Sequence, residues 1–158
     1  QEGELHRHWG EEKVLRLLPY AKRRASYADE GAIYLAHPGS VEDFALSDRE
    51  HMLGEFYRRE CAIAIPAFIE KYSQAYGVQV NEWRLRRMKT RWGSCNIGAA
   101  RIWLNIALAA YPQWCLEYVV VHEIAHLLER YHNARFWRLV ETQFPAWRDA
   151  RNRLNGGV

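Results

Sequence analysis

The sequence predicts a single α+β domain in which a small mixed or antiparallel sheet packs on one buried helix, with further helices around it. Its 158 residues suit one domain, 1–158, with one hydrophobic core. Short apolar runs separated by glycine and proline predict a strand-rich N-terminal segment over 1–48, and 48–158 supplies a long helix, a hairpin and the rest of the core. A helix near 114–126 is apolar nearly all round, which predicts burial at the centre.

The first long helical pattern extends over about 48–76 and follows the best local strand candidate, 32–36. Ser47 and Glu50 fit a capping box at the start of this helix. Pro66 lies inside the pattern and should kink or divide the helix, because proline lacks the amide hydrogen that one helical hydrogen bond needs.

Two strand-like segments follow, one over about 80–91 and one over 101–105. Between them, 92–98 carries two glycines and is typical of a turn or bulge, so the two segments are predicted to form a hairpin. Further helices are expected after Pro112, from Asn133 up to Pro145, and over about 146–154.

The formal net charge of +3 does not by itself indicate nucleic-acid binding, and it does not exclude it. Basic residues crowd one stretch, which we interpret as a solvated basic face, with an anionic substrate as the alternative. These residues are Arg84, Arg86, Arg87, Lys89, Arg91 and Arg101. Three widely spaced cysteines, no signal-peptide pattern and no run approaching about 20 apolar residues lead us to expect a cytoplasmic protein without a membrane segment.

The residues with the clearest chemical meaning form the segment His122-Glu123-Ile124-Ala125-His126. Two histidines four residues apart stand on one face of a helix and can bind one metal ion. Glu123 is offset around the helix, where it can reach a metal-bound water without ligating the metal. Unpaired histidine and glutamate side chains are costly to bury in so apolar a helix, which argues against the alternative of two ordinary core histidines.

A catalytic zinc usually takes three protein ligands and leaves a fourth position for water. His132 is the best third ligand, because the five residues after the motif are enough to end the helix and fold the chain back. It also precedes Asn133, a predicted helix N-cap. Glu141 is the competing ligand. Glu129 is either a group that orients an imidazole or a solvated carboxylate near the helix end.

These motifs resemble the YgjP-like (DUF45) metal-dependent hydrolases, a family grouped with the minimal zincin-type metallopeptidases. The resemblance covers roughly 80–155 and is looser before it. It is carried by Arg91-Trp92-Gly93-Ser94-Cys95, Leu104-Asn105, the run from Tyr118 to Leu127, His132, Phe136-Trp137 and Pro145. The resemblance implies a zincin-like core with strands beside the active-site helix. It also implies one zinc per chain on His122, His126 and His132, with Glu123 as the base.

The motif and the resemblance together predict a zinc-dependent hydrolase, with a metallopeptidase as the main hypothesis and Glu123 as general base. Arg91 and Asn105 are candidate donors to the developing oxyanion, with structural roles as the alternative. A peptide or protein substrate is favoured because an extended chain can pair with a strand beside the helix. One alternative, which the resemblance also implies, is a nucleoside-triphosphate pyrophosphatase or phosphohydrolase. Another is a non-catalytic zinc-stabilised binding module, against which Glu123 argues.

Overall fold

The computed structural model describes residues 3–21 and 25–155, and its first part is a four-stranded sheet. The strand order is β1-β2-β4-β3, with β2 and β4 parallel and the two outer pairs antiparallel. The strands are β1 (Leu5–His8), β2 (Glu11–Leu18), β3 (Tyr27–Ala28) and β4 (Ala32–Ala36). The last of these coincides with the strand predicted over 32–36, and the sheet confirms the strand-rich character of the N-terminal segment.

A single long helix, α1 (Leu46–Tyr76), follows the short 3-10 helix η1 (Val41–Asp43) and is continuous over 31 residues. A kink or a division was expected at Pro66, and the helix is not divided there. Pro66 is exposed, and Ile65 and Tyr72 on either side of it are buried in the core. Tertiary packing of the buried face therefore holds the helix together where one backbone hydrogen bond is missing.

The start of α1 differs from the predicted capping box of Ser47 and Glu50. The helix begins at Leu46, so Ser47 already lies inside the first turn. Asp48 takes the capping role, because its Oδ2 accepts a hydrogen bond of 3.0 Å from the backbone N–H of Ala45. The predicted capping box is therefore wrong: the N-cap is Ala45, which has no polar side chain, and only an acidic residue three positions after it makes a capping hydrogen bond.

A second sheet has three strands in the order β5-β7-β6, with β5 parallel and β6 antiparallel to the central strand. The strands are β5 (Glu82–Arg86), β6 (Gly93–Asn96) and β7 (Arg101–Asn105). The predicted hairpin between 80–91 and 101–105 is wrong, because the stretch expected to be a turn contains β6, and β6 forms the antiparallel pair with β7. A four-residue strand that begins with glycine has too little intrinsic strand preference to be recognised without its partner.

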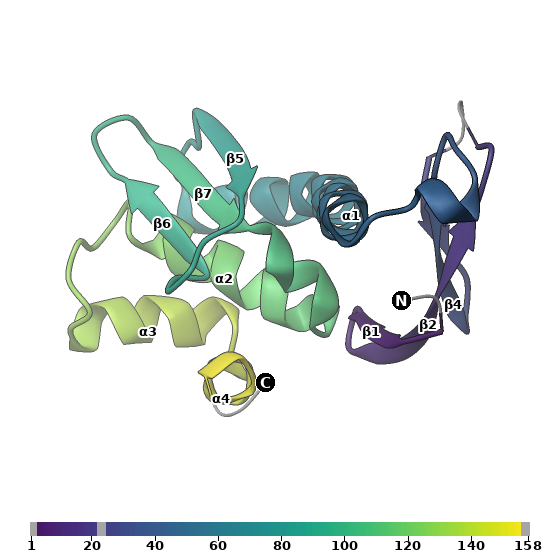
Figure 1. The fold of residues 1–158 in the computed structure, drawn as a ribbon. Helices are drawn as coiled ribbons and strands as arrows, with labels where there is room; N and C mark the ends of the chain where they lie inside the picture. The colour runs from purple at the N-terminus through teal and green to yellow at the C-terminus, as the bar shows by residue number, and fades with distance from the viewer. Residues whose placement is uncertain (1–2, 22–24, 156–158) are drawn as a thin grey trace.

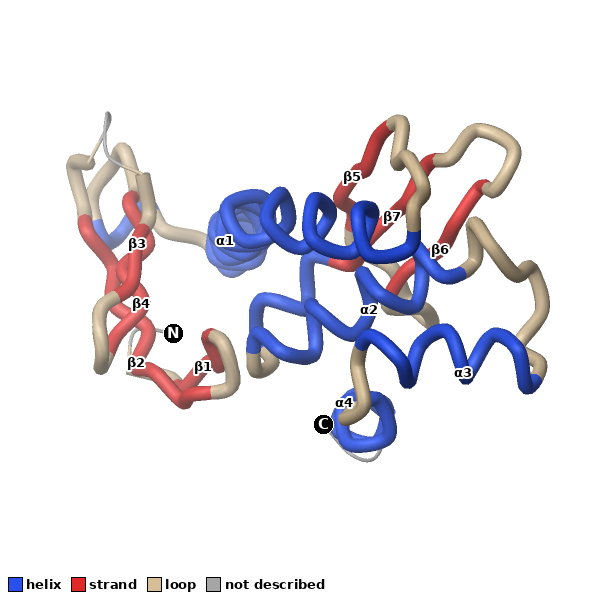
Figure 2. The backbone as a smooth tube through the Cα atoms, turned by 180° about the vertical axis from the view of Figure 1, so that it is seen from behind, coloured by secondary structure: helices blue, strands red, loops and turns tan. Residues whose placement is uncertain are grey.

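The buried helix α2 lies between the second sheet on one side and the two C-terminal helices on the other (Figures 1 and 2). The 3-10 helix η2 (Ile106–Ala110) leads from β7 towards it, and the helices are α2 (Gln113–Ala125), α3 (Ala134–Gln143) and α4 (Trp147–Asn155). Nine of the thirteen residues of α2 are buried, which confirms its predicted central position. No helix in the described part of the chain is long and apolar enough to cross a membrane.

The hydrophobic core is continuous from the N-terminal sheet to the C-terminal helices. Leu15 and Ile33 of the first sheet belong to the same buried cluster as Phe56 of α1 and Val120 of α2. The turn between β1 and β2 also reaches the other part of the chain, because the N–H of Trp9 donates to Ala109 O over 2.7 Å. This continuity is what one domain over 1–158 requires, and that assignment stays a prediction.

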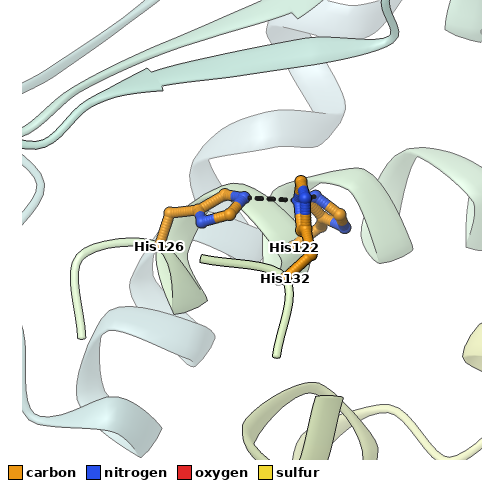
Figure 3. Close-up of side chains that lie close together, drawn as sticks. All are labelled: His122, His126 and His132. Carbon is orange, nitrogen blue, oxygen red and sulfur yellow. Dashed lines mark hydrogen bonds between the residues drawn. The ribbon is translucent and has the colours of Figure 1, made fainter. Parts of the chain in front are cut away.

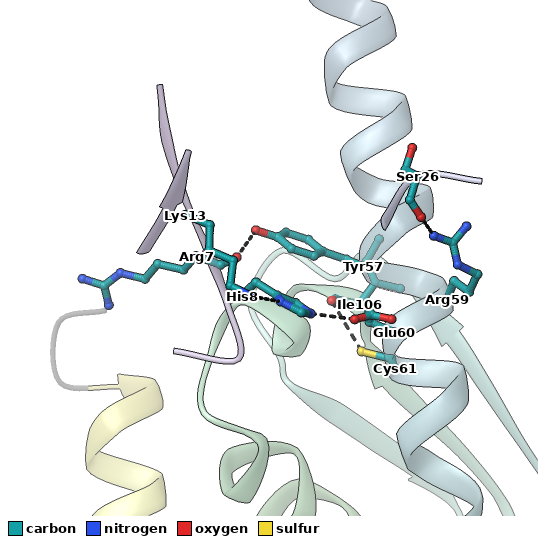
Figure 4. A network of polar contacts seen from close by, with 9 residues as sticks. All are labelled: Arg7, His8, Lys13, Ser26, Tyr57, Arg59, Glu60, Cys61 and Ile106. Carbon is teal, nitrogen blue, oxygen red and sulfur yellow. Dashed lines mark hydrogen bonds and ion pairs between the residues drawn. The ribbon is translucent and has the colours of Figure 1, made fainter. Parts of the chain in front are cut away.

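A buried polar cluster fastens the first sheet to α1 (Figure 4). His8 lies between Lys13, whose Nζ is 3.0 Å from His8 Nδ1, and Glu60, whose Oε1 is 2.6 Å from His8 Nε2. Lys13 and His8 are 7% and 8% exposed. A neutral imidazole accepts from the ammonium at one nitrogen and donates to the carboxylate at the other. Burial, the larger cause, and the Lys13 charge lower the pKa of His8, although Glu60 opposes them.

The free energy of unfolding should therefore fall in acid more steeply in the parent than in a His8→Gln variant. The native state holds His8 neutral, so below the ordinary histidine pKa of about 6.5 the unfolded state binds more protons, and stability is lost as the pH falls. The excess slope approaches at most about 1.4 kcal/mol per pH unit. Urea unfolding of both proteins with chelator, at a series of pH values, measures it. Equal slopes would show that His8 is not held neutral.

Candidate metal centre

Three histidine side chains converge at the end of α2 (Figure 3). His122 lies in the last turn of this helix, His126 is its C-cap, and His132 comes from the loop before α3. The Nε2 atom of His132 is 3.1 Å from that of His122 and 3.0 Å from that of His126. The structure thus brings together all three predicted ligands, and one nitrogen atom of each lies within 4.8 Å of those of the other two.

The loop that carries His132 is fixed at both of its ends. Asn133 caps α3, as predicted, because its Oδ1 accepts a 3.0 Å hydrogen bond from the N–H of Phe136. Its Nδ2 donates to the carboxylate of Glu129 over 2.5 Å, and Arg135 donates to Leu128 O over 2.8 Å. The carboxylate of Glu129 therefore holds the returning chain and does not contact an imidazole.

The other ring nitrogens of the two helical histidines have partners of their own. His126 Nδ1 is 3.0 Å from the backbone oxygen of Glu129, a contact that requires a hydrogen on Nδ1 and leaves a lone pair on Nε2. His122 Nδ1 is 3.3 Å from the Tyr118 hydroxyl. Tyr118 lies four residues before His122, so helical spacing was the signal that could have identified it.

The charge state of this cluster favours a cation as its occupant. Burial, the larger cause, and the neighbouring histidines lower the pKa of His122 to about 3, and burial also lowers the pKa of His126. Both imidazoles are therefore neutral at pH 7, the form that binds metals. One Nε2–H of His132 can donate to only one of its two nitrogen neighbours, so hydrogen bonding alone leaves lone pairs facing each other. A metal ion bound by all three nitrogens removes that conflict, and the residues fit zinc.

Glu123 follows the first ligand and is packed between α2 and β6, with 6% of its surface exposed. It lies against Gly93, where a Cβ atom would stand 3.0 Å from Glu123 Oε2 and 2.9 Å from Val119 Cγ1. A glycine is therefore needed at this point of β6, a requirement that the sequence did not reveal. Burial raises the pKa of Glu123 to about 8, and the Arg91 guanidinium acts in the opposite direction.

A cavity of about 1050 Å³ adjoins the cluster, between α2 and the edge strand β6. Its lining includes the three histidines, Glu123 and Arg91. The competing ligand Glu141 is not among the residues that line it, and its Oε1 accepts from Arg148 Nη1 over 3.1 Å. Cys95 also lines the cavity, but it is not part of the cluster of converging ligand atoms, and burial raises its pKa to about 12.

Asn105 differs from Arg91 in its surroundings. It is 3% exposed and is not among the residues that line the cavity. Its Nδ2 donates to Met88 O and to Arg91 O over 2.9 Å each, and its Oδ1 accepts from Ala107 N over 3.0 Å. These contacts occupy its polar atoms and indicate the structural role that was the alternative for this residue.

Replacing Asn105 by alanine should lower the free energy of unfolding by about 2–4 kcal/mol, because the carbonyl oxygens of Met88 and Arg91 lose a donor in partly buried contacts and the N–H of Ala107 loses its acceptor. Urea unfolding measures the change. Asn81→Ala is the matched control, because the side chain of the exposed Asn81 donates a single hydrogen bond, of 3.0 Å, to Ala99 O. Its loss should stay below about 1 kcal/mol. An Asn105→Ala variant as stable as this control would show that the carbonyls find other donors.

A helix that presents histidines suited to a metal ion and packs beside the edge strand of a small mixed sheet is the arrangement expected of a metallopeptidase, and the comparisons agree with it. The model of the YgjP-like metallopeptidase domain matches residues 1–156, so the chain belongs to the YgjP-like family. Among solved structures, it is similar to the metallopeptidase zymogen of Pyrococcus abyssi abylysin, with 27% identity and a TM-score of 0.51 over 56% of this chain and 89% of that one. No curated protein matches the chain.

Proposed function

We propose that this protein is a zinc-dependent peptidase that holds one zinc ion on His122, His126 and His132 and uses Glu123 as general base. The observation that carries the proposal is the convergence of three Nε2 atoms beside a buried carboxylate on the same helix. Zinc bound there would polarise a peptide carbonyl and acidify a water molecule. We include a cytoplasmic location in the proposal, on the three free cysteines.

The residues around the cavity are suited to a peptide. β6 is an edge strand, and its four residues, Gly93–Asn96, all line the cavity, so an extended peptide can pair with its backbone. The charge of a bound zinc ion would lower the pKa of Glu123, whose carboxylate would then accept a proton from water and deliver it to the leaving amine. Arg91, on the cavity wall, supplies a positive charge for the developing oxyanion.

The alternative of a phosphohydrolase is supported by one observation, the basic side chains of Arg86 and Arg87 beside a smaller cavity. Arg101, another residue of the basic stretch, instead pairs with Glu82. The alternative of a non-catalytic zinc module is not favoured by the geometry, because such sites are usually closed by four protein ligands and only three converge within the described residues.

The test is metal content and metal-dependent activity in untagged protein purified without chelators. Elemental analysis should find about one zinc per chain. Cleavage of a labelled casein should stop with chelator and return when zinc is added. A protein that contains no zinc and takes none up on titration would refute the proposal. So would a zinc-loaded protein that hydrolyses nucleoside triphosphates and no peptide.

A further inference from the structure

A second cavity, of about 330 Å³, lies in the segment that connects β5 to β6. It shares Arg91 and Ser94 with the larger cavity at the histidines, so the two adjoin. The connecting segment is held in place by Asn105, which donates hydrogen bonds to the carbonyl oxygens of Met88 and Arg91. Arg86 also has a neighbour that stabilises its position, because its guanidinium lies over the Trp103 ring, 4.7 Å from the ring centre.

The charges around the two cavities are almost all of one sign. Six cationic side chains line them, and Glu123 is the single carboxylate among the lining residues. The six cations are Arg86, Arg87, Lys89, Arg91, Arg130 and Arg151. The whole chain holds 22 basic and 19 acidic residues, so this concentration does not follow from composition.

Ion pairs with described carboxylates are also missing from these cations, and the charge of Arg91 acts on Glu123 without such a contact. None of the six takes part in an ion pair with a described carboxylate, whereas Arg84 and Arg101 on the same sheet both pair with Glu82. Unpaired cations that share a concave surface repel each other, and they attract an anion strongly because low-dielectric walls focus their field. An arginine fork in addition binds a carboxylate at two points.

We propose that the two adjoining cavities select peptide substrates that carry aspartate or glutamate side chains beside the scissile bond. This inference rests on the proposed peptidase function and names its substrate class. A peptide paired with β6 would pass Ser94, in that strand, and Arg91, in the segment before it, and would then reach the smaller cavity that both residues line. Its acidic side chains there meet Arg86, Arg87 and Lys89.

The first experiment compares paired fluorogenic peptides that differ only by glutamate or glutamine on both sides of the cleaved bond. At low salt, kcat/KM for the acidic peptide should be at least about tenfold higher, a ratio that salt reduces. Combined Arg86→Gln, Arg87→Gln and Lys89→Gln substitutions should bring the ratio towards one. Combined Arg16→Gln, Lys71→Gln and Arg138→Gln substitutions remove the same charge from exposed positions outside both cavities, and should keep the ratio.

The second experiment measures binding without catalysis, by the fluorescence anisotropy of a labelled oligoglutamate peptide added to the zinc-loaded Glu123→Gln protein. The same triple substitution should weaken binding by at least about tenfold. Cleavage of peptides without acidic preference, together with no oligoglutamate binding, would overturn this inference alone. Binding without cleavage of any peptide by the zinc-loaded parent would refute the peptidase function and, with it, the substrate class. Displacement of the peptide by oligothymidylate of equal length at lower concentration would overturn the inference in favour of a nucleic-acid ligand.

Discussion

Replacement of Glu123 by glutamine is expected to lower kcat on peptides by about 10³-fold or more and to leave the zinc content unchanged. Glutamine keeps the shape of the side chain and removes the group that accepts the proton. The shape matters here, because Glu123 is packed against Gly93, where even a Cβ atom would stand 3.0 Å from Glu123 Oε2. Steady-state kinetics and elemental analysis of the same preparation give both quantities.

Glu129→Gln is the matched control for this experiment. Glu129 lies on the same segment and is half-buried, but its carboxylate contacts Asn133 and takes no part in the proton transfer assigned to Glu123. Its variant should stay within about tenfold of the parent, since it removes a single hydrogen-bonded charge. A Glu123→Gln protein with more than about a tenth of the parental kcat would exclude Glu123 as general base, because base catalysis contributes at least about 10²-fold.

Replacement of His132 by alanine should abolish stoichiometric zinc binding, with an affinity at least about 10²-fold weaker and peptide cleavage lost in parallel. The two helical histidines remain, but they leave the ion without its third protein ligand. His132 is exposed, so the metal-free variant should unfold within about 0.5 kcal/mol of the metal-free parent. Zinc titration with a competing chelator gives the affinity, and urea unfolding gives the stability.

Two control variants make this result specific. Glu141→Ala removes the acidic residue that competed for the third ligand position, and it should bind zinc as the parent does, because Glu141 pairs with Arg148. His51→Ala removes an exposed histidine of α1 and controls for the loss of any imidazole. Zinc loss in the Glu141→Ala protein with full zinc in the His132→Ala protein would reassign the third ligand.

The local features of the site could be predicted because each depends on short-range geometry. A spacing of four residues places His122 and His126 on one helix face whatever the rest of the chain does. Asn133 was recognisable as a cap because its side chain bonds three residues ahead. The apolar composition of α2 predicted its central position, since a helix without a polar face cannot lie on the surface.

Other features depended on contacts between segments far apart in the chain. Strand β6 gains its hydrogen bonds from β7, so the sequence 92–98 alone indicated a turn. The parallel pairing of β5 with β7 likewise had no local signal, because pairing is fixed by long-range contacts rather than by residue preference. Arg101 and Arg86 belong to the same basic stretch in the sequence. Only the register of β5 and β7 places Arg101 opposite Glu82, with which it forms an ion pair.

The sequence by itself determined the residues on which the proposed chemistry depends: the three histidines, their spacing and the adjacent carboxylate. The tertiary structure decided what surrounds them. It buried Asn105 under the connecting segment, pressed Glu123 against Gly93 and left six cations around two adjoining cavities. The physical reason is the distance along the chain over which each effect acts. Helix geometry acts over four residues, whereas burial, pKa and charge concentration depend on which distant segments pack together.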